Sequence, residues 1–265
     1  MGFQAEFDGV GSTSMKYDIV LCMKVSEKQW IKLLRNGQVC FNPVETFITK
    51  AETSGNNEQG DKYEGIFARI KTDDMRLEKL RKRFGDDLEE TIECGYVLLR
   101  RKSSRNIPVF CAYGIKKDEL KIVEDSIQEE AGEYKCTVEY DFPDKIYNGF
   151  LDCADVWGFY ASSGHFCAAL EEALDRNHLL YAKAVISYDI DPTKEFYFEP
   201  DSEYSELNHK RRDLEYQHET RYRLLGFPRN EKYLLDYIPL SEHSCGIAPG
   251  ALCLEMHCMC ELLDT

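Results

Sequence analysis

The stretch that most restricts the fold is YQHETRYR, residues 216–223. We expect it to begin a β-strand that covers residues 216–225. Side chains alternate between the two faces of a strand, so Gln217, Glu219, Arg221 and Arg223 share one face. This polar face is either a solvated sheet edge or the lining of a cleft that binds an anionic, hydroxyl-rich ligand.

The apolar patterns around this stretch predict more strands than helices. The other expected strands cover residues 17–25, 39–41, 66–71, 96–101, 109–115, 136–141 and 179–188, with 96–101 paired to 109–115. The expected helices cover residues 26–36, 72–84, 117–131, 165–176 and 249–263, and residues 49–63 form a long polar loop. Because these elements do not alternate strand by helix, we predict an α+β fold with a mainly antiparallel sheet and peripheral helices.

The composition restricts where the protein works and what it binds. The chain has 265 residues, a formal net charge of -15 and 11 cysteines. The negative charge argues against direct nucleic-acid binding, which depends on clustered Lys and Arg. No apolar run approaches the roughly 20 residues of a membrane span, so we expect no membrane partner. Cysteines within apolar stretches indicate reduced thiols and a cytoplasmic location.

The domain organisation is expected to be simple. Residues 1–14 carry no clear hydrophobic period and end in Gly-Ser-Thr-Ser. We interpret them as an N-terminal extension, such as one added for expression, and exclude them from the fold. Residues 15–265 contain no repeat or low-complexity linker, and we predict a single α+β domain there.

Two clusters contain residue types that could bind metal. His243, Cys245, Cys253, His257, Cys258 and Cys260 lie close together near the end of the chain. The helical pattern predicted there does not place all of them on one face, so we interpret the cluster as a Cys-rich buried helix and expect no metal. Carboxylates also gather at Glu45, Asp61 and Glu64, where acid–base chemistry or metal binding competes with a solvated turn.

The order of several short motifs resembles a bacterial family that carries a domain of unknown function. The matching pieces, spread over roughly residues 17–260, are LRNG (34–37), FNPVE (41–45), VFCAY (109–113), WGFY (157–160), KAVISY (183–188) and HETRYR (218–223). The same order is similar to the ADP-ribosyltransferase fold. That likeness implies a two-sheet fold and NAD as the cofactor.

The likeness to ADP-ribosyltransferases also implies roles for particular residues. Gln217-x-Glu219 matches the late-strand motif, so Glu219 would be the catalytic carboxylate that stabilises an oxocarbenium-like transition state. Tyr160 would be the aromatic that stacks on nicotinamide. Lys24 stands where the family has Arg or His and would contact a phosphate as a point charge. Arg221, on the same strand face as Glu219, would contribute to binding the nucleotide-type ligand.

Three functions therefore remain open at the level of sequence. The first is an NAD-dependent ADP-ribosyltransferase-like enzyme in a phage–host defence or toxin setting, with a protein acceptor. The second is a non-catalytic acidic module, also from a phage or defence setting, that binds a basic protein partner. The third is a metal-dependent hydrolase or nuclease built on Glu45, Asp61 and Glu64.

Overall fold

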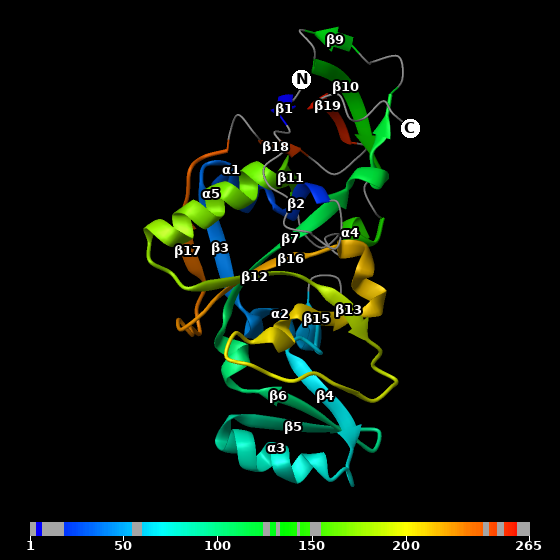
Figure 1. Ribbon diagram of the computed structural model, residues 1–265, viewed down its shortest axis with the longest axis vertical. Helices are drawn as coiled ribbons and strands as arrows, with labels where there is room; N and C mark the ends of the chain where they lie inside the picture. Colours follow the sequence, from blue (N-terminus) through cyan, green and yellow to red (C-terminus); the bar gives the residue numbers. More distant parts are fainter. Residues whose placement is uncertain are drawn as a thin grey trace. The chain divides into compact units, whose positions relative to one another are not determined.

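The computed structural model has an α+β fold with mostly antiparallel sheets and few helices (Figure 1). It describes residues 4–6, 19–54, 60–123, 128–130, 133–141, 144–148, 155–240, 244–247 and 252–258. No helix within these ranges is long and apolar enough to span a bilayer. The expected fold class is thus confirmed at the level of α+β.

The chain divides into two compact units. Unit 1 contains Met1–Cys40, Cys111–His178 and Leu234–Thr265, and unit 2 contains Phe41–Phe110 and Leu179–Tyr233. Each unit is therefore built from segments that are distant in sequence. The expectation of one domain over residues 15–265 stays a prediction.

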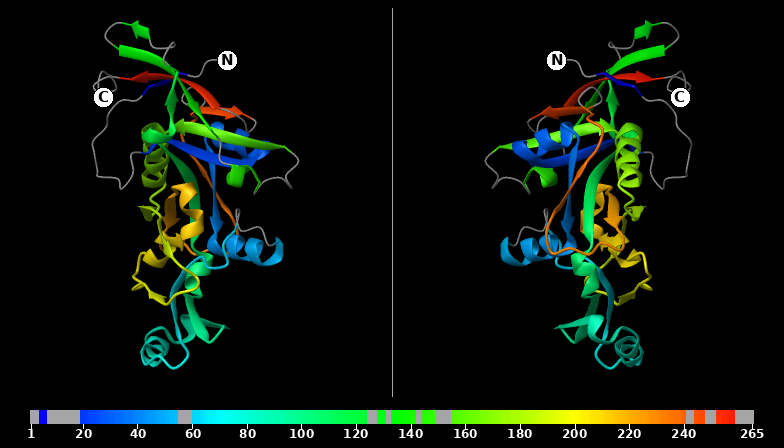
Figure 2. Two further views of the ribbon diagram at one scale, coloured as in Figure 1. Left: turned by 90° about the vertical axis from the view of Figure 1, so that its right-hand side faces the viewer. Right: turned by 90° about the vertical axis from the view of Figure 1, so that its left-hand side faces the viewer.

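The sheet of unit 1 is centred on β2 (Ile19–Glu27), a run of nine residues that is largely buried. This strand pairs antiparallel with β11 (Val156–Ser162) and with β7 (Pro108–Lys116). Figure 2 shows β2 in blue beside β11 in green. On its other edge, β11 pairs with β18 (Ser244–Ile247). The apolar run that predicts a central strand is confirmed in the described part, residues 19–25.

Two helices pack against this sheet. Helix α1 (Lys28–Arg35) contacts β2 and β11 and buries Ile31 and Leu34. It ends at Asn36, because Gly37 follows with a φ of 89°, a backbone conformation that favours glycine. The longer helix α5 (Ser163–Arg176) also packs against β2 and β11. The predicted helices 26–36 and 165–176 are confirmed, within one or two residues at each start.

A second sheet of unit 1 corrects two predicted helices. Its strands are β1 (Gln4–Glu6), β8 (Lys121–Ile122), β9 (Gln128–Glu130), β10 (Glu133–Tyr140) and β19 (Leu252–Cys258). The predicted helix over 249–263 is wrong in the described residues, because 252–258 form a strand that pairs with β10. The predicted helix over 117–131 is also wrong. A single turn, η3 (Lys117–Glu119), precedes β8 and β9, which both pair with β10.

Residues 4–6 belong to this second sheet as well. Strand β1 lies parallel to β19, with Ala5 opposite Met256. Three residues of the segment predicted to be an extension therefore take part in sheet pairing. The short helix α4 (Asp144–Asn148) completes the described elements of the unit.

In unit 2, a four-stranded antiparallel sheet packs against one helix. Its strands are β14 (Phe196–Tyr197), β4 (Ile66–Lys71), β6 (Tyr96–Arg101) and β5 (Leu88–Glu93), in that order. Helix α3 (Arg76–Phe84) contributes Leu77 and Leu80 to a core cluster with Phe67 and Leu99 of the sheet. Each such buried leucine stabilises the fold by about 1.5–3 kcal/mol.

Several boundaries in unit 2 differ from the sequence-based expectation. The predicted pairing of 96–101 with 109–115 is wrong, because β6 lies between β4 and β5. Helix α3 starts at Arg76, not at residue 72, because Asp74 accepts a hydrogen bond from the Arg76 backbone N–H (2.8 Å) in a preceding turn. The predicted loop 49–63 is helical up to Ser54, as part of α2 (Val44–Ser54).

The remaining elements of unit 2 include two further strand pairs. Strand β12 (Tyr181–Val185) pairs antiparallel with β16 (Thr220–Leu224), and β13 (Ser187–Ile190) pairs parallel with β15 (His209–Arg211). The other elements are η1 (Gly85–Asp87), η2 (Ser103–Asn106), η5 (Ser205–Asn208), η6 (Arg212–Gln217) and, at the boundaries of the units, β3 (Gln38–Pro43) and β17 (Tyr233–Asp236). The predicted strand 179–188 is therefore two strands, and the predicted strand 216–225 begins at Thr220.

Candidate functional site

Glu219 occupies a fixed position directly before β16. The 3₁₀ helix η6 ends at Gln217, and His218 turns the chain with a φ of 40°. The Glu219 backbone N–H donates to the Tyr188 hydroxyl (2.8 Å), and its carbonyl accepts from the Ile186 backbone N–H (2.9 Å). Both backbone groups of Glu219 are thus tied to the segment containing Ile186 and Tyr188.

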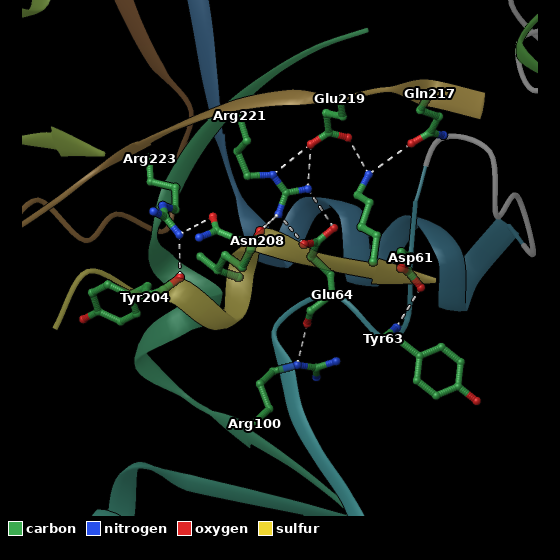
Figure 3. A network of polar contacts seen from close by, with 12 residues as sticks. Asp61, Tyr63, Glu64, Arg100, Tyr204, Asn208, Gln217, Glu219, Arg221 and Arg223 are labelled. Carbon is green, nitrogen blue, oxygen red and sulfur yellow. Dashed lines mark hydrogen bonds and ion pairs between the residues drawn. The ribbon is translucent and has the colours of Figure 1, made fainter. Parts of the chain in front are cut away.

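The Glu219 carboxylate lies between two cations and is 2% exposed (Figure 3). Lys210 Nζ donates to Glu219 Oε2 (2.6 Å) and to Gln217 Oε1 (3.2 Å). Arg221 Nε donates to Glu219 Oε1 (2.9 Å). Both carboxylate oxygens therefore accept charge-assisted hydrogen bonds, the strong class of hydrogen bond in proteins.

Arg221 joins Glu219 to a second carboxylate, Glu64. Its Nη2 donates to Glu64 Oε2 (3.1 Å), and its Nη1 donates to Glu64 Oε1 and to the Leu207 carbonyl (2.6 Å). Arg221 is 1% exposed, and Arg100 Nε donates to the Glu64 backbone oxygen (2.9 Å). The guanidinium is thus the centre of a buried ionic network drawn in Figure 3.

Asp61 lies at the edge of the same network. Its Oδ1 accepts from the Tyr63 backbone N–H (2.9 Å) and lies 3.4 Å from Arg211 Nε. Its Oδ2 is buried and has no hydrogen-bond partner among the described residues. Burial, and after it the charge of Glu64, raises the pKa of Asp61 to about 6, against the opposing effect of Arg211. Asp61 therefore changes charge near neutral pH.

Arg223 is a buried cation whose hydrogen bonds go to neutral acceptors. Its Nη1 donates to the Tyr204 carbonyl (2.8 Å) and to Asn208 Oδ1 (2.6 Å). Its Nε is buried without a hydrogen-bond partner in the described chain. Burial, followed by repulsion from Arg221, lowers the pKa of Arg223 to about 10. An anion close to this guanidinium would relieve both effects.

The buried charges of the described residues all belong to unit 2, and positive charge is in excess. Four are acidic and six are basic: Asp61, Glu64, Glu206 and Glu219, and Arg69, Arg100, Arg101, Lys210, Arg221 and Arg223. Burying charge costs folding free energy even when the charges are paired. The candidate functional site is the part of this set that Lys210 and Arg221 link, namely Gln217, Glu219 and Glu64, together with the strongly perturbed carboxyl of Asp61. Arg101 and Glu206 bind each other outside this site.

The predicted site residues fall into two groups. Gln217, Glu219 and Arg221 come together in unit 2, where Lys210 and Arg221 connect them. The solvated-edge interpretation of this face is wrong, because these side chains are at most 3% exposed. The suggested roles of Gln217 and Arg221 in binding a cofactor stay predictions.

Lys24 and Tyr160 belong to unit 1. Lys24 on β2 is opposite Phe159 and donates from Nζ to the Cys111 carbonyl (2.7 Å). Tyr160 on β11 is opposite Met23 and is 1% exposed. Since strand neighbours alternate in direction, Lys24 and Tyr160 lie on opposite faces of their sheet. Their suggested roles in binding NAD stay predictions.

The carboxylates proposed for a metal site are engaged with arginines. Glu45 accepts from Arg105, and Glu64 accepts from Arg221. Within the described residues, no group of three or more His, Cys, Asp or Glu side chains is placed to hold a metal. His243 and Cys260 of the C-terminal cluster lie outside the described residues, and the side chains of its other members are not described.

Lys210 is the residue of the site that sequence reasoning missed. It lies in the basic run Lys210-Arg211-Arg212, which is typical of a solvated surface. In the structure, Lys210 lies on β15 and donates to Glu219, and the neighbouring Arg211 lies close to Asp61. The presence of Gln217 and Glu219 a few residues later was the available signal for a buried lysine.

The network places ionised carboxylates and one titratable carboxyl beside buried cations. Such a combination suits chemistry in which positive charge develops or a proton is moved. Comparisons of the chain with protein-family models, with curated proteins and with solved structures found no match.

Proposed function

We propose that the protein is an NAD-dependent ADP-ribosyltransferase-like enzyme in which Glu219 stabilises the positive charge that develops on ribose as nicotinamide leaves. The observation that carries this proposal is the position of the Glu219 carboxylate, buried and oriented by Lys210 and Arg221 beside Gln217. A carboxylate fixed in a water-poor site stabilises a developing cation more strongly than one in water. NAD supplies the ribose–nicotinamide bond when it is bound.

The cations of unit 2 support a ligand that carries phosphate groups. Lys210 and Arg221 hold Glu219, and Arg223 has neutral hydrogen-bond partners. Phosphate oxygens accept from guanidinium groups in the same geometry as a carboxylate does. A diphosphate that takes hydrogen bonds from Lys210 or Arg221 would release one Glu219 oxygen toward the ribose. Binding of the ligand would then itself free the Glu219 oxygen that acts on the ribose.

The test is release of nicotinamide from NAD by the wild type, by Glu219→Gln and by Glu206→Gln. Glu206 is the matched control, because it is also fully buried and accepts two hydrogen bonds of 2.8 Å from Arg101. The proposal predicts release by the wild type and by Glu206→Gln, and loss of release in a folded Glu219→Gln. Equal release by Glu219→Gln and the wild type would refute the role of Glu219.

One observation favours a second candidate, a non-catalytic module that binds a basic partner. Both Glu219 oxygens are occupied and the residue is 2% exposed, an arrangement that also suits a purely structural ion pair. The net charge of -15 would then provide the binding surface. This candidate predicts no nicotinamide release and a complex that weakens as salt rises.

A further inference from the structure

Asp61 differs from the other buried acids of unit 2 in having an oxygen without a partner. Glu64, Glu206 and Glu219 each have both carboxylate oxygens in hydrogen bonds to arginine or lysine. Asp61 has one oxygen bonded to the Tyr63 backbone N–H, while Oδ2 is buried and has no hydrogen-bond partner among the described residues. Burial of an open acceptor is costly, so this oxygen needs an explanation.

The charged groups that face Asp61 connect it to the Glu219 network. Glu64 lies on its own turn, and Lys210 and Arg211 approach from β15. Lys210 donates to Glu219 Oε2, and its positive charge also acts on Asp61, whose pKa it lowers. Asp61 therefore lies one side chain away from the carboxylate to which the proposed chemistry is assigned.

The pKa of Asp61 lies in the range that suits a general base. Its pKa is raised to about 6, mainly by burial and then by Glu64. At neutral pH the carboxyl is largely ionised, yet it still binds a proton readily. General bases act most efficiently when their pKa lies near the working pH.

We infer that Asp61 Oδ2 accepts the proton of the attacking group, and hence that the acceptor in the transfer is a hydroxyl, with water as its simplest member. This inference rests on the proposed function. In the step, the bond from ribose C1′ to nicotinamide nitrogen breaks and its electron pair stays on nicotinamide. The acceptor oxygen forms a bond to C1′, and its proton passes to Asp61. A carboxylate acceptor would need no such base.

The experiment measures nicotinamide release from NAD with water as the acceptor, between pH 4.5 and 8, for the wild type, Asp61→Asn, Asp61→Ala and Glu206→Gln. We expect wild-type release to rise with pH through a midpoint near 6, because the base must lose its proton. In Asp61→Asn the rate should fall by about 10²-fold or more and become independent of pH over that range. Glu206→Gln should keep the wild-type profile.

A small acid distinguishes a base from a structural residue. Formate supplied to Asp61→Ala should restore part of the lost rate, whereas a structural defect would not respond to formate. Wild-type rates and an unchanged pH profile in Asp61→Asn would overturn this inference and leave the proposed function standing. Absence of release from the wild type at every pH would overturn both.

Discussion

Replacing Arg221 by Met should destabilise unit 2 more than any single change at an exposed ion pair. Methionine keeps most of the side-chain length but removes the charge and all donors. Arg221 is 1% exposed and donates to Glu219, to Glu64 and to the Leu207 carbonyl. The substitution therefore leaves two carboxylates buried without the cation between them.

The expected loss of unfolding free energy in Arg221→Met depends on the hydrogen-bond partners that the two carboxylates keep. Glu219 keeps its 2.6 Å hydrogen bond from Lys210, whereas Glu64 loses the side chain that holds both of its oxygens. Removing one partner of a buried ion pair costs about 3–5 kcal/mol. We expect about 4 kcal/mol, which corresponds to a shift of about 2 M in the urea midpoint at a slope of about 2 kcal/mol/M.

The assay is urea unfolding at pH 7 of the wild type, Arg221→Met and the control Arg83→Met. The ion pair of Arg83 with Glu199 is about half exposed on both sides (49% and 59%), so water and salt screen it and its loss should hardly change the urea midpoint. The loss of unfolding free energy in Arg221→Met should also be smaller at acid pH, because burying a protonated carboxyl costs less free energy than burying a carboxylate. A loss in Arg221→Met no larger than in Arg83→Met would refute the buried network as described.

Three further changes test the pH response and the turns. The pKa of Asp61 is about 6 in the folded state against 3.8 ordinarily, so ionisation of Asp61 should lower the free energy of unfolding by about 2 kcal/mol as pH rises from 4 to 7. This contribution is absent from Asp61→Asn, so urea unfolding at both pH values should show the stability difference between wild type and variant changing by that amount. Gly37→Ala should lower the melting temperature more than Gly85→Ala. Both positions have positive φ, but a Cβ at Gly37 would lie 2.4 Å from the Tyr237 backbone oxygen, whereas a Cβ at Gly85 would meet open space. Cys94→Asn should stabilise the β5–β6 hairpin by a few tenths of a kcal/mol, and Cys94→Ala should not, because the residue has a φ of 51° in a two-residue turn that favours Asn.

Much of the fold could be predicted where a single pattern decided the structure. The run Ile66–Lys71 is confirmed as β4, in which the apolar residues Ile66, Phe67, Ala68 and Ile70 are all buried. The residues 252–258 were misassigned, because the apolar residues of LCLEMHC also fit a helical period. Pairing with β10, more than one hundred residues earlier in the chain, is what makes this segment a strand.

The site could be predicted in part. Gln217, Glu219 and Arg221 do lie together, but only Arg221 is on the strand, and Gln217 is the last residue of the 3₁₀ helix η6. Whether that polar face meets solvent or other charges depends on partners distant in sequence. Glu64 precedes Arg221 by 157 residues, and a local pattern contains no information about such a pair.

Binding at the network is most directly tested by the side-chain Nε–Hε resonances of the arginines in ¹⁵N-labelled protein, recorded as NAD is added. The account predicts that the Arg221 resonance shifts in a saturable way, because the diphosphate competes with Glu219 for its guanidinium. The resonance of Arg101, which is held by Glu206, should stay in place. No shift of the Arg221 resonance at millimolar NAD would contradict the claim that this network is the ligand site.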